Sequence, residues 1–221
     1  MAEELIISED LSPTLYSPDF NAHYHSLHGA MTETMVVFID AGLNFKLKEK
    51  AHINILEIGF GTGLNAFATL LNLPMDAEIN YVTLEKFPLS GEITDDFIGK
   101  LNLDQQAIAL YQAIHACPWG DFQKIVPSFN LKKIRVDFLE FRTNYFFDLI
   151  YFDAFAPDTQ PELWDGELFG YLYERLVNGG VLTTYCAKGI VKRKLKEIGF
   201  IIESLPGPPG KREITRAIKQ S

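Results

Sequence analysis

The sequence predicts an α/β protein with a mostly parallel central sheet and helices on both faces of that sheet. Three observations predict this class. Short apolar runs rich in branched and aromatic residues alternate with segments that have the length and composition of helices. A glycine-rich turn at residues 59–63 joins the first such run to a helical segment, as in a doubly wound domain. Acidic residues follow several runs, at the edge where open α/β sheets bind ligands.

The composition is that of a globular protein. The chain has 221 residues, 47% hydrophobic and 22% charged, which suits one domain with a large core. We divide it into an N-terminal cap, residues 1–50, and a main domain, residues 51–221. No apolar run approaches the roughly 18–20 residues of a membrane span, and the first residues do not resemble a signal peptide. Cys117 and Cys186 are far apart and form no cluster, so we expect a cytoplasmic protein that does not bind membranes.

Charge is distributed unevenly along the chain. The formal net charge is -9, yet residues 187–221 contain nine Lys or Arg and only three Glu. Such asymmetry is compatible with one local surface for an anionic partner on an otherwise acidic protein. On composition alone, a solvated helix face with a charged tail is the simpler explanation.

Residues 1–50 precede the first strand of the predicted core. A turn-rich, partly extended segment comes first, and a helical pattern follows at about residues 30–41. His23, His25 and His28 lie close together, but their spacing matches no standard metal site, so we expect no metal. We interpret this segment as a cap that folds over the cofactor or substrate.

The first core strand, residues 53–57, leads into glycines at 59, 61 and 63 and then into a helix at residues 64–73. Glycines let the backbone pass close to a ligand and adopt dihedral angles closed to other residues. The dinucleotide fingerprint needs its third glycine three places after the second, and here the third follows by two. The Gly-Lys-Ser/Thr of a phosphate loop is also absent, so neither of these motifs describes the turn.

The second strand, residues 79–84, ends at Glu85. An acid about 20 residues beyond a glycine turn, at the end of the next strand, is placed to bind ribose hydroxyls. An exposed loop acid is the alternative interpretation. The third strand, residues 131–136, ends at Asp137. Between these strands Pro88 and Asp104 begin two predicted helices, at about residues 88–100 and 104–115.

The fourth strand, residues 146–152, is dense in aromatic and branched residues and is followed by Asp153. Its carboxyl end should lie beside that of the first strand, at the switch point of the sheet, where ligands bind. Small and apolar residues and Pro157 follow, which suits the wall of a pocket. Asp153 could instead cap the helix predicted at about residues 161–176, but Thr159 is closer and is the better cap candidate.

The last part of the chain completes the sheet with a hairpin. Asn178, Gly179 and Gly180 are predicted to end the preceding helix, and Gly199 is predicted to end a short basic helix. A stiff loop at residues 206–210 joins the final two strands. The predicted elements are strands at residues 181–186, 200–205 and 212–218 and the basic helix at residues 188–198.

The pattern Glu57-x-Gly59-x-Gly61-x-Gly63 resembles motif I of the class I methyltransferases that bind S-adenosylmethionine. The resemblance implies a Rossmann-like fold with a seven-stranded, mostly parallel sheet and helices on both faces. Further motifs together look like one family, the methyltransferase half of the bacterial bifunctional enzyme that makes 5-methylaminomethyl-2-thiouridine at the tRNA wobble position. They are Asp153-Ala154-Phe155-Ala156-Pro157, Trp164, Leu168-Phe169, Gly179-Gly180 and residues 207–213, and the similarity runs from about Thr14 to Ile218.

In that two-part enzyme, a flavin-dependent oxidase leaves an aminomethyl uridine, and the methyltransferase then adds one methyl group to the amine. The resemblance therefore implies an enzyme with S-adenosylmethionine as its cofactor and tRNA as its substrate. The sequence has no second glycine fingerprint and ends where the oxidase would begin. We therefore expect a stand-alone methyltransferase without flavin. A monomer is compatible with the sequence, which does not determine the oligomeric state.

The resemblance also implies roles for individual residues. Asp153 is the expected catalytic residue, because a carboxylate can orient the attacking amine and accept its proton. The expected cofactor contacts are Glu57 near the methionine amino group, Glu85 at the ribose, and Asp137 and Phe138 at the adenine, with Gly59, Phe60, Gly61, Gly63, Asn65, Lys86 and Asp153. The expected substrate contacts are Phe155, Pro157, Lys188, Lys192, Arg193, Lys211 and Arg212, the basic ones through phosphates.

Two alternatives remain open on the sequence. A polyamine synthase of the same fold would transfer an aminopropyl group, although such enzymes typically carry a second Asp in place of the Ala154-Phe155 part. A non-catalytic cofactor-binding scaffold would keep the sheet, but the acids Glu57, Glu85 and Asp153 at three strand ends argue against it.

Overall fold

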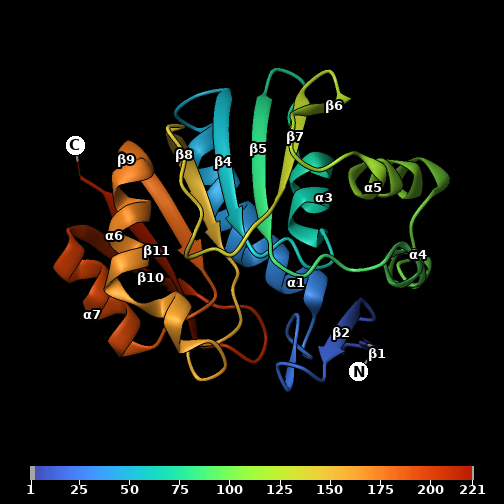
Figure 1. Ribbon diagram of the computed structural model, residues 1–221, viewed down its shortest axis with the longest axis horizontal. Helices are drawn as coiled ribbons and strands as arrows, with labels where there is room; N and C mark the ends of the chain where they lie inside the picture. Colours follow the sequence, from blue (N-terminus) through green and yellow to red (C-terminus); the bar gives the residue numbers. More distant parts are fainter. Residues whose placement is uncertain (1–2, 221) are drawn as a thin grey trace.

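The computed structural model describes residues 3–220 and contains two sheets (Figure 1). The main sheet has eight strands in the order β10-β11-β9-β8-β4-β5-β7-β6, and a three-stranded antiparallel sheet lies near the N-terminus. The strands of the small sheet are β1 Glu4–Ile7, β2 Pro13–Ser17 and β3 Ala22–His23. Those of the main sheet are β4 His52–Ile58, β5 Glu78–Glu85, β6 Gln123–Val126, β7 Phe129–Arg135, β8 Phe147–Phe152, β9 Leu176–Thr184, β10 Phe200–Pro206 and β11 Glu213–Lys219.

The strand order is that of a doubly wound domain, so the predicted fold class is confirmed. Five neighbouring strands, β7, β5, β4, β8 and β9, are parallel, and the order reverses between β4 and β8. β11 runs antiparallel between β9 and β10, as predicted for the closing hairpin. The main sheet has one strand more than expected, because β6 pairs antiparallel with β7 at the edge. No strand or helix was predicted from the sequence at residues 123–126.

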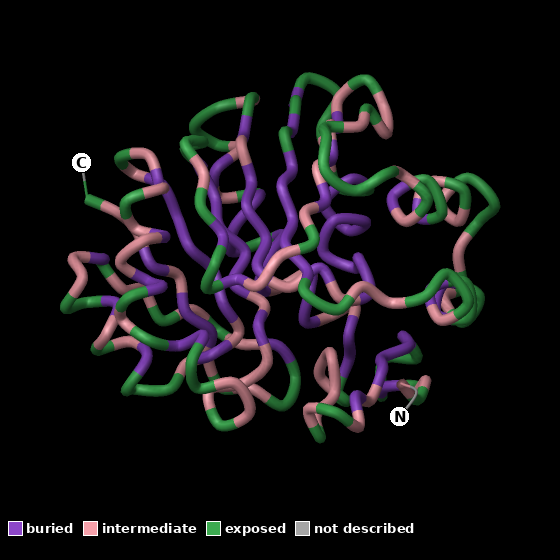
Figure 2. Tube along the Cα trace, viewed as in Figure 1, coloured by how far each residue is buried: buried purple, intermediate pink, exposed green. Residues whose placement is uncertain are grey.

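Helices cover both faces of the main sheet, and Figure 2 shows the strands between them buried along most of their length. Leu149 and Tyr151 of β8 face a core shared with η1, α3 and α5, while Ile150 and Phe152 face a core shared with α6 and α7. The helices are α1 Ala30–Thr34, the π-helix η1 Met35–Leu43, α2 Asn44–Leu47, α3 Leu64–Leu71, α4 Gly91–Gly99, α5 Gln105–Ala116, the 3₁₀ helix η2 Pro161–Trp164, α6 Gly166–Arg175 and α7 Gly189–Ile198.

The N-terminal helical segment is longer than predicted. It continues through α1, η1 and α2 to Leu47 instead of ending near Ala41. Its middle is a π-helix of nine residues, a wider helix that is frequent at functional sites. Gly42 allows close approach to the sheet, since a Cβ atom there would lie 3.1 Å from a ring carbon of Tyr151. The segment therefore packs directly on β8 and β9.

The start of α6 differs from the prediction. Residues 161–164 form the short helix η2, and α6 begins only at Gly166. The N-cap of α6 is Asp165, whose carboxylate accepts a hydrogen bond from the backbone of Gly166, so the prediction that Thr159 caps this helix is wrong. Thr159 lies instead in a turn of the loop after β8.

The end of α6 also differs from the prediction. The helix stops at Arg175, because Leu176 is extended and pairs with Phe147 as the first residue of β9. Gly179 and Gly180 therefore do not end the helix but lie inside β9, where the pairing with β8 shifts register. Gly179 has a φ of 72°, which a β-bulge commonly requires of glycine.

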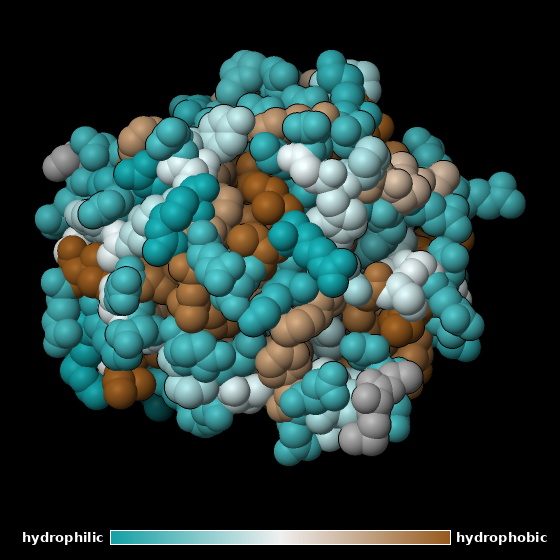
Figure 3. All heavy atoms as spheres, in the orientation of Figure 1, coloured by the Kyte–Doolittle hydropathy of each residue, from teal (hydrophilic) through white to brown (hydrophobic). Residues whose placement is uncertain are grey.

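A loop takes the place of a helix between β7 and β8. It covers part of the sheet, and its Phe138 and Phe141 join the core beside α6. Figure 3 shows apolar side chains at the surface in the middle of this face, over β4 and β5. Within residues 3–220, none of the helices has the length and apolar character that crossing a bilayer would demand.

Candidate functional site

A cavity of about 440 Å³ opens at the carboxyl ends of the parallel strands. Residues after β4, β5, β7 and β8 all contribute to its wall, so it surrounds the switch point where α/β sheets bind ligands. Its lining includes eleven of the predicted site residues, namely Gly59, Phe60, Gly61, Asn65, Glu85, Lys86, Asp137, Phe138, Asp153, Phe155 and Lys211. Seven others, Glu57, Gly63, Pro157, Lys188, Lys192, Arg193 and Arg212, lie outside the lining.

The glycine turn forms the part of the wall next to Asp153. Gly59 has a φ of 94°, and a Cβ atom there would stand 2.7 Å from the backbone oxygen of Asp153. Gly63, outside the cavity, has a φ of 72° at the N-cap of α3, and a Cβ atom there would stand 2.7 Å from His115 Nε2. Both positions therefore require glycine for backbone conformation and for space.

Glu57 is fully buried behind the turn and does not reach the cavity. Neither of its carboxylate oxygens has a hydrogen-bond partner among the described residues, and the hydroxyls of Tyr81 and Thr83 beside it are also unpartnered. Burial raises the pKa of Glu57 to about 8, and the nearby Asp153 adds to that rise. A neutral Glu57 is the form that such an environment favours near neutral pH.

Glu85 connects the end of β5 to the glycine turn. Its Oε2 accepts the N–H of Gly61 at 3.0 Å, and its Oε1 accepts the N–H of Phe87 at 2.8 Å. Each oxygen keeps a further lone pair. The carboxylate is therefore fixed in orientation and still able to accept hydrogen bonds from a ligand.

Asp137 and Lys86 form an ion pair at the rim, with Lys86 Nζ 2.5 Å from Asp137 Oδ2. That hydrogen bond lowers the pKa of Asp137, so its carboxylate is charged at neutral pH. Asp137 Oδ1 also accepts the N–H of Leu139 at 3.0 Å, which fixes the loop that carries Phe138.

Asp153 is held by a chain of two hydrogen bonds from helix α1. Thr34 Oγ1 donates to Asn65 Oδ1 at 2.9 Å, and Asn65 Nδ2 donates to Asp153 Oδ2 at 2.7 Å. Because the hydroxyl donates to one end of the Asn65 amide, the other end must present its N–H groups to Asp153. Burial raises the pKa of Asp153 to about 7, and the negative charge of Glu33 adds to the rise.

Several lining residues were not predicted from the sequence. Glu33 of α1 is buried and forms an ion pair with Lys211, which comes from the loop between β10 and β11. Tyr185 lies under that ion pair, with Lys211 Nζ 4.1 Å from its ring centroid. A charge among the apolar residues of an amphipathic helix was the signal that could have identified Glu33.

The N-terminal segment forms the outer wall of the cavity. Phe20 stacks on Phe155 with ring centroids 4.7 Å apart, and the ring of Tyr24 meets Phe155 edge-on at 5.3 Å. His25 bridges this segment to the glycine turn, with its Nε2 3.2 Å from Thr62 Oγ1. Burial lowers the pKa of His25 to about 4, so its imidazole is neutral at neutral pH.

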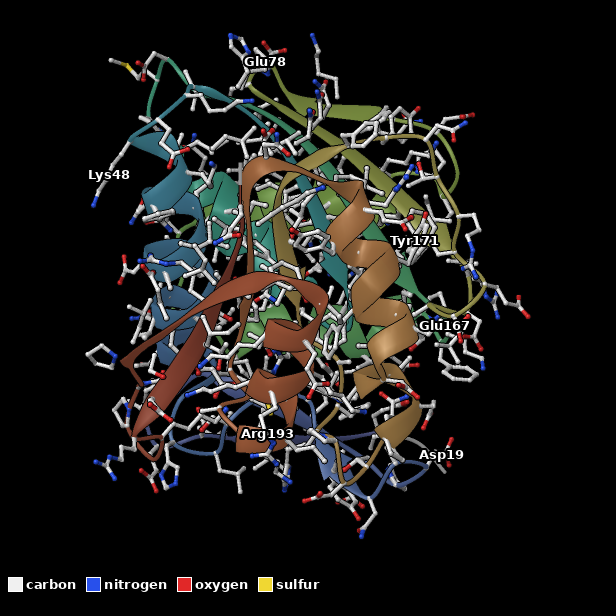
Figure 4. The ribbon with its side chains drawn as sticks, turned by 90° about the vertical axis from the view of Figure 1, so that its left-hand side faces the viewer. Asp19, Lys48, Glu78, Glu167, Tyr171 and Arg193 are labelled. Atoms are coloured by element: carbon white, nitrogen blue, oxygen red, sulfur yellow. The ribbon has the colours of Figure 1, made fainter. Side chains whose placement is uncertain are left out.

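The predicted basic contacts separate into two groups. Lys188 pairs with Asp158 at 2.5 Å and Lys192 with Glu213 at 2.7 Å, while Lys211 is occupied inside the cavity by Glu33. Arg193 and Arg212 are exposed. Figure 4 shows Arg193 on α7 at the same end of the molecule as Asp19, with Lys48 and Glu78 toward the other end. No group of three or more potential metal ligands occurs among residues 3–220.

Comparisons with known proteins agree with this geometry. Residues 118–220 match a family described as S-adenosyl-L-methionine-dependent methyltransferase. The structure is similar to that of MnmC2 from Aquifex aeolicus, with a TM-score of 0.81 and 25% identity over 98% of this chain and 70% of that one. The fold is that of class I S-adenosylmethionine-dependent methyltransferases. S-adenosylmethionine, expected from the sequence, is the cofactor of the matched family.

Curated proteins that match this chain in sequence are much longer than it. The tRNA 5-methylaminomethyl-2-thiouridine biosynthesis bifunctional protein MnmC of Cupriavidus metallidurans is 28% identical over 245 residues, covering 97% of this chain and 33% of that protein. The chain thus spans about one third of the length of such relatives. These matches confirm the family resemblance stated from the motifs. Spermidine synthase from Thermotoga maritima shares the fold at 16% identity and a TM-score of 0.61.

Proposed function

We propose that this chain is an enzyme that transfers the methyl group of S-adenosylmethionine to the amine of 5-aminomethyl-2-thiouridine at the wobble position of tRNA, in the cytoplasm. The observation that carries the proposal is the position of Asp153, a carboxylate with a pKa near 7 in the wall of a cavity at the switch point of this fold. The names of the long relatives, which refer to 5-methylaminomethyl-2-thiouridine biosynthesis, support the choice of substrate.

The residues present fit S-adenosylmethionine. Glu85 would accept hydrogen bonds from the ribose hydroxyls with its remaining lone pairs, and Asp137 would accept one from the adenine amino group, next to Phe138. The glycine turn contributes Gly59 and Gly61 to the wall without side chains that would fill the space. The cofactor, when bound, supplies a methyl group already activated on a positively charged sulfur.

Glu57 would act at a distance in this assignment. Since it lies behind the turn, outside the cavity lining, its expected contact with the methionine amino group requires a bridging water. Gly63 likewise acts through the backbone, because it begins α3 and lies outside the cavity lining.

Asp153 orients the amine and removes its proton. An ammonium nitrogen has no lone pair, so it must lose a proton before it can attack the methyl carbon. Asn65 occupies Asp153 Oδ2, which leaves Oδ1 to accept that proton. A base with a pKa of about 7 is matched to this task near neutral pH, because a substantial fraction is deprotonated and that carboxylate is still basic.

The aromatic wall suits a base taken out of the anticodon stack. Specific recognition of RNA usually targets unpaired bases that stack on aromatic side chains. Phe20, Tyr24 and Phe155 already form such a cluster beside Asp153. We assign the wobble base to this cluster, and Pro157 to the rim beyond it.

The direct test is methyl transfer. The protein is incubated with labelled S-adenosylmethionine and with tRNA that carries or lacks the aminomethyl group, and wobble nucleosides are identified by mass spectrometry. Label in 5-methylaminomethyl-2-thiouridine, only with the aminomethyl tRNA, is expected. A parallel reaction supplies putrescine and decarboxylated S-adenosylmethionine labelled in its aminopropyl group. Label in the polyamine product there, with no methyl transfer to tRNA, would favour the polyamine synthase alternative and overturn the proposal.

Two exposed arginines are the proposed phosphate contacts. Reversing both charges, in the double variant Arg193→Glu/Arg212→Glu, is expected to weaken tRNA binding at least about tenfold. The slope of the logarithm of the binding constant against the logarithm of salt concentration should fall by about two, one for each lost phosphate contact. Cofactor affinity should not change. Lys48→Glu is the matched control, an exposed charge toward the other end of the molecule (Figure 4). Equal tRNA affinity in the double variant and the control would exclude this surface.

A further inference from the structure

The cavity contains an ion pair that the proposed methyl transfer does not explain. Glu33 is 6% exposed, and its carboxylate is bonded to Lys211 Nζ. The two residues are 178 positions apart in the chain and come from α1 and from the loop between β10 and β11. Both line the same cavity as Asp153. A buried ion pair costs desolvation energy and is weak evidence for stability, so a role in the site is the more informative explanation.

The ion pair is connected to Asp153 on both sides. On one side Thr34, the neighbour of Glu33, begins the hydrogen-bond chain that ends on Asp153. On the other side Lys211 lies over the ring of Tyr185, whose hydroxyl donates to the backbone oxygen of Ala154 at 2.8 Å. Movement of either member of the ion pair would therefore displace groups that contact Asp153 or its neighbour Ala154.

The titratable groups around Asp153 come from several elements, but only two of them carry charges that act on it. Glu33 of α1 raises its pKa, whereas Lys211 and the hydrogen bond from Asn65 lower it. The remaining titratable neighbours are Glu57 of β4, Tyr81 of β5 and Tyr185 beyond β9. Burial raises the pKa values of all three, so they are largely neutral near pH 7 and leave Glu33 and Lys211 as the charges that act on Asp153.

We propose that Glu33 and Lys211 are positioning residues for Asp153, and that the balance of their two charges sets how readily Asp153 takes the proton of the incoming amine. This inference rests on the proposed function. In the step concerned, the proton moves from the ammonium nitrogen to Asp153 Oδ1, and the electron pair of the broken N–H bond stays on nitrogen as the nucleophile. Glu33 makes the carboxylate a better acceptor, and Lys211 limits that effect so that a fraction of Asp153 stays deprotonated near neutral pH before the substrate binds.

Direct titration of Asp153 tests the inference without any substrate. Aspartate labelled with ¹³C at the carboxyl carbon is incorporated into the full chain, and the Asp153 signal is identified as the one missing from Asp153→Asn. Glu33→Gln should lower the midpoint by about one pH unit, because it removes a negative charge and leaves Lys211 unopposed. Adding Lys211→Gln to that variant should recover part of the shift, while Lys211→Arg alone should titrate like the unmodified chain.

The order of the three midpoints decides the outcome. The inference predicts the highest value for the unmodified chain, an intermediate value for the Glu33→Gln/Lys211→Gln variant and the lowest for Glu33→Gln. A purely structural ion pair would leave the midpoint unchanged in every variant that still folds, and that result would overturn the inference. Far-ultraviolet circular dichroism on the same samples identifies variants that do not fold.

A turnover measurement separates this inference from the proposed function. If tRNA is the substrate, the acidic limb of the pH profile of kcat/KM should move to lower pH in Glu33→Gln by the same amount as the titration midpoint. The ionisation of the substrate amine contributes equally to the profiles of the unmodified protein and the variant, so it does not affect the difference between them. Shifted midpoints without methyl transfer to tRNA would support the ion pair and reject the substrate. Unshifted midpoints with normal methyl transfer to tRNA would support the tRNA substrate and reject the inference about the ion pair.

Discussion

The substitution Asp153→Asn isolates the carboxylate without disturbing its surroundings. Asparagine has nearly the same size, and its amide oxygen can still accept the hydrogen bond that Asn65 Nδ2 makes to Asp153 at 2.7 Å. The chain from Thr34 through Asn65 is therefore retained. The change removes only the charge and the basicity, so the fold and the affinity for S-adenosylmethionine should stay within a few-fold of the unmodified protein.

The expected loss of turnover follows from the role of a positioned base. General base catalysis typically contributes about 10²–10⁴ in rate, which corresponds to roughly 3–5 kcal/mol of transition-state stabilisation. We expect a loss of kcat in that range for Asp153→Asn. The unmodified protein should show kcat/KM falling as pH drops below about 7, because the carboxylate then takes up a proton and no longer accepts one from the amine. The variant should lack the part of that dependence that comes from Asp153 and keep only the part that comes from the substrate amine.

Single-turnover transfer of labelled methyl groups to aminomethyl tRNA measures the chemical step, and isothermal titration with S-adenosylmethionine measures the binding. Asp153→Ala is a useful second variant, since it also removes the hydrogen bond to Asn65 and should lose at least as much. Turnover of Asp153→Asn within tenfold of the unmodified protein, with the same dependence on pH near 7, would remove Asp153 from the mechanism.

Two further predictions concern stability. The raised pKa of Glu57, about 8 against a usual 4.5, means that the folded protein binds a proton there which the unfolded chain loses, so unfolding free energy should fall as pH rises from about 4.5 to 8. Glu57→Gln should remove that decline, which amounts to about a few kcal/mol at most by pH 8. Urea unfolding of both proteins at pH 5.5 and 8 measures the difference. The same change in unfolding free energy between the two pH values in both proteins would contradict the prediction. Gly59→Ala should destabilise by roughly 1–3 kcal/mol and abolish cofactor binding, because φ is 94° and the new Cβ atom would meet the backbone of Asp153 at 2.7 Å. Gly91→Ala, where a Cβ atom would have nothing within 4 Å, is the matched control and should be neutral or slightly stabilising in thermal unfolding.

Much of the site could be predicted because strand ends are marked locally in the sequence. Glu85, Asp137 and Asp153 each follow an apolar run, and the topology of a parallel sheet brings such ends to one edge. The same local reasoning could not identify Glu33, because its importance comes from Lys211, 178 positions away. It also assigned Lys211 to a surface, since a lysine in a polar loop looks the same whether it faces solvent or a cavity.

The fold details that differ have similar physical causes. Strand β6 is only four residues long, and it exists because β7 offers an unpaired edge, which is a tertiary condition. The boundary between α6 and β9 is decided by pairing of Leu176 with Phe147, which overrides the usual tendency of Gly179 to end a helix. Local composition therefore locates elements well and their boundaries poorly.

The ion pair between Glu33 and Lys211 has a consequence for the order in which the protein is made. One member is in the first helix and the other near the last strand, so the wall of the cavity is incomplete until nearly the whole of this stretch has been synthesised. Until then the carboxylate of Glu33 lacks its partner. This part of the cavity wall should therefore form late, and contacts of such long sequence separation are expected to slow folding.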